Sequence, residues 1–336
     1  MTRRSFLAAA ASSALGAAAP RTAMGIATTS FMIARRPNDT LEFLEYCHSL
    51  GAGGIQASLT SLDAAYIKRL RERTEELGMY LEVMAGLPGE NADLFESTVA
   101  AAKEAGALCI RSACLGGRRY ETFASLDDWN RFVSDSKKAI ERALPVVQKW
   151  RMPLALENHK DWTLEELTAL LEQYSSGYLG ACLDTGNNIA LLDDPMEFVE
   201  KLAPYAVSTH LKDMAVAEYE SGFLLSEVPL GAGFLDMKRI VGVIVKARPA
   251  TRMTLEMITR DPLKVPCLTE KYWVTFPGRN GAHLARTLAM VRANRPREPL
   301  PALAELDGGG RARLERENVE RCLFYAREQL VLRDVG

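Results

Sequence analysis

Short apolar segments alternate with amphipathic helical segments from residue 25 to residue 295, and this alternation constrains the fold more than any other feature. Strands are predicted at 25–33, 54–59, 80–86, 107–115, 153–158, 179–184, 206–211 and 253–257. A helical segment follows each strand, and a loop or hairpin reaching Gly233 separates the seventh strand from its helix. Apolar runs of this length are typical of strands buried on both faces, so eight such units predict an α/β fold, a (β/α)8 TIM barrel.

An open doubly wound sheet is the alternative architecture for the same alternation. Such a sheet usually has a glycine-rich phosphate loop after its first strand, where this sequence has Thr28-Thr29-Ser30. We therefore assign residues 25–295 to the barrel, and residues 296–336 to a linker and an extra C-terminal helix over 311–332. An apolar stripe on this helix predicts packing on its own barrel or on a second subunit, so a homo-oligomer is a possible assembly.

The first nineteen residues predict an export signal rather than a part of the barrel. Arg3 and Arg4 precede Phe6 and Leu7, and an Ala-rich apolar run then continues to Ala19. A charged start, a short apolar stretch and small residues at the end are typical of such signals, and the arginine pair resembles the twin-arginine class. The run is short for a membrane span, so we expect no stable membrane insertion and a periplasmic or otherwise exported protein.

The balance of charges limits the class of partner. The chain has 41 basic and 43 acidic residues and a formal net charge of −2, which argues against nucleic acid or an anionic membrane as the main partner. Hydrophobic residues make up 48% of the chain, which excludes intrinsic disorder. A small-molecule partner is the remaining expectation.

One metal-capable side chain stands at the end of each of the last four predicted strands. They are Glu157, Asp184, His210 and Glu256. Because the active site of such a barrel lies at the C-terminal ends of its strands, we expect these four side chains to converge. Three converging carboxylates would raise one another's pKa unless a cation neutralised them. Oxygen ligands with one His favour one divalent metal ion, Mn²⁺ first, with Mg²⁺, Co²⁺ and Zn²⁺ as alternatives.

This set of residues resembles the metal tetrad of the xylose-isomerase-like TIM-barrel superfamily, the sugar phosphate isomerase/epimerase family. Segments 210–213 and 229–236 are similar to that group too, and the resemblance covers about residues 25–295. It implies a barrel that binds a divalent metal ion and acts on a small carbohydrate. It does not fix the reaction, because the relatives include isomerases, epimerases, dehydratases, lyases and decarboxylases.

Two positions depart from the ketose 3-epimerases of that superfamily. Those enzymes usually have a His shortly after the strand-six Asp and an Arg after the strand-seven His, where this chain has Asn187 and Val216. Other groups near the strand ends are candidates for binding the substrate, namely His159, Lys212 and Arg260. A cation beside the metal ion could hold a substrate carboxylate or phosphate, or donate a proton.

The predicted reaction is isomerisation or epimerisation of a sugar or sugar derivative. The metal ion would polarise a carbonyl group and stabilise the enediolate that forms on proton loss, with Glu157 and Glu256 as base and acid. The alternative is a metal-dependent lyase, decarboxylase or dehydratase that acts on a keto-sugar or keto-sugar acid. A sugar-binding protein without catalysis is a third class, but binding alone has little need for two glutamates on one metal ion.

Overall fold

The computed structural model describes residues 20–33, 37–296 and 299–332, so the predicted export signal lies outside the described residues. Its largest sheet has parallel strands in the order β10-β1-β2-β3-β4-β5-β6-β7. These strands are β1 (Gly25–Ala27), β2 (Gly54–Ala57), β3 (Tyr80–Met84), β4 (Ile110–Ala113), β5 (Leu154–Glu157), β6 (Leu179–Asp184), β7 (Ala206–His210) and β10 (Thr254–Leu255). A parallel bridge between Leu211 and Leu255 joins β7 to β10. The predicted (β/α)8 barrel is confirmed.

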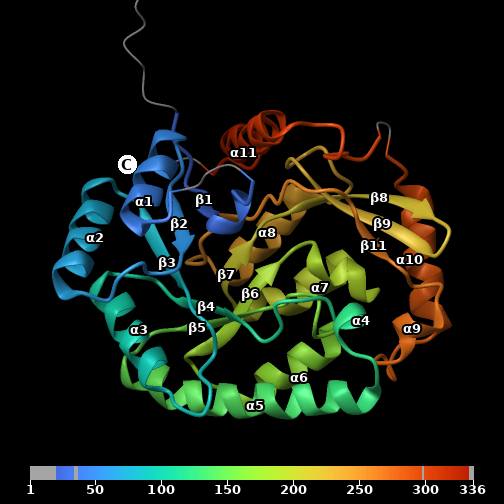
Figure 1. Ribbon diagram of the computed structural model, residues 1–336, viewed down its shortest axis with the longest axis horizontal. Coiled ribbons are helices and arrows are strands. Elements are labelled where there is room, and N and C mark those ends of the chain that lie inside the picture. The colour runs from blue at the N-terminus through green and yellow to red at the C-terminus, as the bar shows by residue number, and fades with distance from the viewer. Residues whose placement is uncertain (1–19, 34–36, 297–298, 333–336) are drawn as a thin grey trace, which may run out of the picture.

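The helices surround the barrel, and Figure 1 shows α1, α2, α3, α5 and α6 along its outside. They are α1 (Thr40–Ser49), α2 (Ala64–Glu76), α3 (Asp93–Glu104), α4 (Arg119–Thr122), α5 (Leu126–Lys149), α6 (Leu164–Tyr174), α7 (Pro195–Leu202), α8 (Met237–Ala247), α9 (Glu270–Trp273), α10 (Gly281–Ala293) and α11 (Gly308–Glu328). Several begin at a residue whose side chain accepts hydrogen bonds from the first backbone N–H groups of the helix. Thr163, for example, forms a capping box with Glu166 at the start of α6.

The structure differs from the sequence prediction at the first strand, and after the seventh strand it has the hairpin, which is one of the two alternatives that the sequence predicts. The strand predicted over 25–33 ends at Ala27, because a 3₁₀ turn, η1 (Thr28–Ser30), follows it. After β7 the chain forms a hairpin of β8 (Asp213–Tyr219) and β9 (Gly222–Val228). β11 (Leu263–Val265) pairs antiparallel with β9, so two segments from different parts of the chain make a second sheet.

Polar and small side chains line the interior of the barrel. Cys109, Ala155 and Cys182 form a small buried cluster separate from the main core, which lies between the strands and the helices. Because side chains alternate along a strand, the residues two positions further on face the same interior. On β5 and β6 those residues are Glu157 and Asp184, so the predicted site lies directly above this cluster.

A buried arginine fixes the loops around the C-terminal end of the barrel. Arg119 on α4 is fully buried and makes a bidentate ion pair with Glu166, with nitrogen–oxygen distances of 2.6 and 3.1 Å. Its guanidinium carbon lies 3.5 Å from the ring centroid of Trp129 and 4.3 Å from that of Phe276. The Arg119 backbone N–H donates to the Lys160 carbonyl at 3.0 Å, which ties this cluster to the loop after β5.

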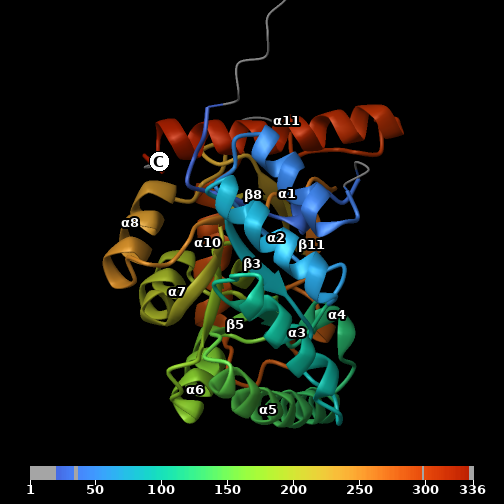
Figure 2. The same cartoon turned by 90° about the vertical axis from the view of Figure 1, so that its left-hand side faces the viewer.

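The C-terminal helix α11 lies across the barrel beside α1, as Figure 2 shows, and Figure 1 shows it near β1. Val319, Cys322 and Leu323 on α11 are buried in the main core, so the predicted apolar stripe packs on its own barrel. The chain then returns to its first described residues, where the Ala23 N–H donates to the Leu332 carbonyl at 2.8 Å. Within the described residues, no helix has the length and apolar character that a membrane crossing needs.

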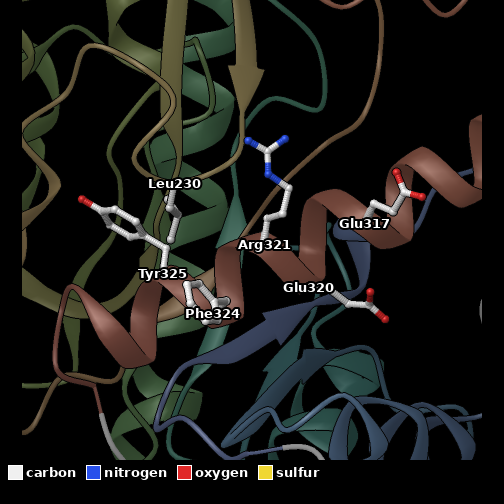
Figure 3. A pocket seen from close by; sticks show the side chains of 6 residues that line it. All are labelled: Leu230, Glu317, Glu320, Arg321, Phe324 and Tyr325. Carbon is white, nitrogen blue, oxygen red and sulfur yellow. The ribbon is translucent and has the colours of Figure 1, made fainter.

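A surface hollow of about 600 Å³ lies beside α11 (Figure 3). Residues of α11 and Leu230 line it, and its most exposed apolar side chain is Phe324. It contains none of the predicted site residues, since those lie at the strand ends.

Candidate metal centre

The four residues predicted as metal ligands come together at the C-terminal end of the barrel. Glu157 ends β5, Asp184 ends β6, His210 ends β7 and Glu256 directly follows β10. Each offers a ligand atom, and these atoms all lie within 4.8 Å of one another. All four side chains are buried, with exposed fractions of 0–2%.

Each carboxylate of this tetrad has one oxygen held by hydrogen bonds and one oxygen whose only protein partner is the charge of a basic side chain. Asp184 Oδ1 accepts from the backbone N–H groups of Gly186 and Asn187 at 2.9 and 2.8 Å. Glu256 Oε1 accepts from the Thr29 hydroxyl at 2.7 Å, and Glu157 Oε1 accepts from the Asn187 amide at 3.2 Å.

The other oxygen of each carboxylate, together with His210 Nδ1, is buried without a hydrogen-bond partner among the described residues. The three oxygens have ion pairs with Arg111 or Lys212, and four possible ligand atoms this close together are typical of a metal site. A divalent cation fits this donor set of three carboxylate oxygens and one imidazole nitrogen.

The orientation of His210 follows from a chain of hydrogen bonds inside the barrel. Gln56 Nε2 donates to Glu82 at 2.9 Å, which directs Gln56 Oε1 toward His210 Nε2 at 2.6 Å. The amide oxygen can only accept, so His210 Nε2 carries a proton and Nδ1 is left as the ligand atom. Such outer partners of a ligating histidine fix its orientation and tautomer.

Positive groups balance the tetrad without a metal ion. Lys212 Nζ lies 3.0 Å from Asp184 Oδ2 and 2.5 Å from Glu256 Oε2. Burial opposes a charged carboxylate, but His210 and Lys212 hold the pKa of Glu256 well below its ordinary value. Burial also opposes a charged imidazole, yet the neighbouring side chains of Cys182, Glu256 and Asp184 raise the pKa of His210 to about 10. Metal binding therefore has to displace a proton from this histidine.

The residues predicted to bind the substrate have different positions. Lys212 contacts two members of the tetrad, as described above. Arg260 makes a two-point ion pair with Glu227, through Nε at 3.1 Å and Nη2 at 2.5 Å. His159 directs Nδ1 to the Leu115 carbonyl oxygen at 2.9 Å, and burial and the charge of Lys160 lower its pKa to about 3. His159 is therefore neutral. Substrate binding by His159 and by Arg260 stays a prediction.

The sequence prediction missed several charged and polar groups of the site. Arg111 on β4 forms an ion pair with Glu157, and Gln56 on β2 orients His210. A polar residue inside an apolar strand is a signal that could have identified both. Glu227 lies on β9 of the hairpin, and its Oε1 is 3.8 Å from Lys212 Nζ. Nothing in the sequence indicates this contact.

Comparisons with known proteins agree with this geometry. Residues 44–278 match the xylose isomerase-like TIM barrel family. A 3-oxo-isoapionate decarboxylase from Pectobacterium atrosepticum is 30% identical over 226 residues, which cover 64% of this chain and 78% of that protein. The structure of an L-ribulose 3-epimerase is similar with a TM-score of 0.51 and 18% identity, over 92% of this chain and 97% of that one. The structure of the IolI protein with a bound zinc atom is similar with a TM-score of 0.55 and 13% identity, over 80% of this chain and 98% of that one.

Proposed function

Because this chain belongs to the xylose isomerase-like TIM barrel family, we propose that it is a divalent-metal-dependent decarboxylase of a 3-oxo acid derived from a sugar. One observation carries this choice, namely the number of cations around the tetrad. Four basic side chains lie among the carboxylates of the site, and they are Arg111, Lys160, Lys212 and Arg260. The 30% identical decarboxylase supports the same reaction class.

The charge balance favours an anionic substrate. Once metal binding has displaced the proton of His210, the four basic groups and the four carboxylates of the site, those of the tetrad and Glu227, cancel in formal charge. A bound divalent cation would then leave two positive charges uncompensated in a buried site. A substrate carboxylate, and the enediolate that remains when it leaves, would neutralise them.

The chain's own residues would divide the reaction between binding and proton transfer. A divalent cation held by Glu157, Asp184, His210 and Glu256 would polarise the substrate ketone and stabilise the enediolate. Basic side chains would hold the carboxylate until its carbon–carbon bond breaks and CO₂ leaves. A proton would then go to the carbon that lost CO₂, delivered by Glu157 or Glu256, and solvent would replace it.

Isomerisation or epimerisation is the second candidate, and the pair of glutamates favours it. Glu157 and Glu256 each offer one carboxylate oxygen to the same cluster of ligand atoms, which lie within 4.8 Å of one another. One could remove a proton from a substrate carbon and the other could return it. The L-ribulose 3-epimerase is a neighbour in fold only, so it does not decide between the two reactions.

The deciding experiment incubates the Mn²⁺-loaded protein with 3-oxo-isoapionate and related 3-oxo sugar acids, and measures CO₂ and product in D₂O. We expect one CO₂ per product and one deuterium at the carbon that lost it. Deuterium uptake by a ketose without loss of carbon would replace this proposal with the isomerase. Asp184→Asn, which removes one metal ligand, is the control and should be inactive in either case.

We also propose that residues 1–19 direct export through a route for folded proteins. The support is the arrangement of Arg3 and Arg4 before an apolar run that ends in small residues. With the segment fused to a reporter, the double change of Arg3 and Arg4 to Lys should retain the reporter in the cytoplasm. Unchanged export of that variant would refute the twin-arginine assignment.

A further inference from the structure

Lys160 is a buried ammonium group without a carboxylate partner. Its side chain is 3% exposed, and the partner of Nζ is the amide oxygen of Asn187. No described carboxylate lies within ion-pair distance of it, whereas Lys212 contacts Asp184 and Glu256. A buried charge is normally paired, so the surroundings of Lys160 lack an anion.

A second ammonium group shares the same acceptor. Lys212 Nζ lies 3.2 Å from Asn187 Oδ1, which also accepts from Lys160. Burial and the repulsion from Lys212 lower the pKa of Lys160 to about 7. The Asn187 amide nitrogen in turn donates to Glu157 at 3.2 Å. Asn187 therefore links this pair of lysines to a predicted metal ligand.

The loop that holds Lys160 is fixed in an unfavourable backbone conformation. Lys160 has a φ of 60°, in the left-handed region that most residues avoid. Asp161 accepts hydrogen bonds from the backbone N–H groups of His159 and Trp162 at 3.0 and 2.9 Å, which hold the loop in this shape. Both the backbone conformation and the unpaired charge oppose stability, so the structure favours a functional reason for lysine here.

We propose that Lys160 anchors the carboxylate of the substrate next to the metal tetrad, together with Lys212, which shares the Asn187 amide oxygen with it. This inference rests on the proposed function, since it names the group that recognises an acidic substrate and separates it from a neutral sugar. An anion between the two lysines would remove their mutual repulsion and supply the partner that Lys160 lacks.

The test compares the wild type with Lys160→Asn, because asparagine tolerates the left-handed conformation and carries no charge. Malonate is the probe, since one of its carboxylates can bind a metal ion while the other meets the lysines. We expect calorimetry on the Mn²⁺-loaded protein to show malonate binding at least about tenfold weaker in the variant. The metal-free variant should melt at the same temperature as the wild type or higher, whereas a purely structural lysine would lower it.

Two further variants keep the result interpretable. Lys160→Met retains the aliphatic part of the side chain and should lose malonate affinity in the same way. Lys264→Asn removes an exposed positive charge from β11 and should leave malonate affinity unchanged. Equal malonate affinity in the wild type and Lys160→Asn, in a protein that decarboxylates 3-oxo acids, would overturn the role of Lys160 alone. A wild type that does not bind malonate would overturn both the role and the anionic substrate on which it rests.

Discussion

Replacing Gln56 with leucine tests whether the barrel interior prepares His210 for a metal ion. Gln56 is fully buried on β2, two strands from the nearest predicted ligand along the sheet order. Its amide oxygen accepts from His210 Nε2, and its amide nitrogen donates to Glu82 and, at 3.2 Å, to the Ser208 hydroxyl. Leucine has a similar volume but can make none of these contacts.

The expected magnitude follows from the contacts that are lost. Without the Gln56 oxygen, His210 no longer has a fixed tautomer or ring orientation, and loss of such an outer partner typically weakens metal binding by about 10- to 100-fold. That range corresponds to about 1.4–2.7 kcal/mol of binding free energy. Glu82 keeps the Ser208 hydroxyl at 2.7 Å, so the main unsatisfied group is the ring N–H, and the free energy of unfolding should fall by about 1–3 kcal/mol.

Calorimetric titration of metal-free protein with Mn²⁺ measures the first effect, and thermal unfolding without metal measures the second. Gln56→Glu is the matched control, because it retains an acceptor oxygen for His210 and should keep most of the metal affinity. A Gln56→Leu protein that is folded and binds Mn²⁺ as tightly as the wild type would refute the argument.

Three other changes test the tetrad, the lysine pair and the loop cluster. Asp184→Asn removes a charged ligand and should weaken Mn²⁺ binding by more than about 100-fold in the same titration, which exceeds the effect of an outer partner. Folding lowers the pKa of Lys160 to about 7, so the unfolded chain binds the extra proton between pH 7 and the ordinary value of 10.5. The free energy of unfolding of the metal-free wild type should therefore rise with pH, relative to that of Lys160→Asn, by on the order of 1 kcal/mol per pH unit between pH 7 and 10. Denaturant titrations measure this difference. The same dependence of the free energy of unfolding on pH in both proteins would contradict the prediction. Arg119→Lys loses the bidentate ion pair and the aromatic stacking, and thermal unfolding should show a loss of about 2 kcal/mol.

The barrel and the tetrad could be predicted because both depend on local patterns. Each strand is an apolar run buried on both faces, and a single charged residue at its end is visible in the sequence. The rule that parallel strands of a barrel present their C-terminal ends together then brings Glu157, Asp184, His210 and Glu256 to one place. No pairing between distant segments had to be known.

The remainder of the site depends on contacts that no local pattern encodes. Glu227 reaches Lys212 because the chain leaves the barrel as a hairpin, and the pairing of β9 with β11 brings Arg260 to Glu227. Arg111 and Gln56 are polar residues inside apolar strands, which marks their positions in the sequence but does not identify Glu157 and His210 as their partners. The left-handed conformation of Lys160 also has no sequence signal, because glycine or asparagine is expected at such a position.

The contact between Thr22 and Leu332 limits the order in which the parts of the protein can fold during synthesis. These residues are 310 positions apart, yet the Thr22 hydroxyl donates to the Leu332 carbonyl. β1, which follows directly, lies in the sheet between β2 and β10. During synthesis on the ribosome, β1 therefore cannot pair with β10 until residue 254 has been made. The contact of Thr22 with Leu332 forms only after residue 332 has been made. Fragments that end before β10 should leave an open β1 edge and aggregate, whereas a chain that includes β10 closes this edge.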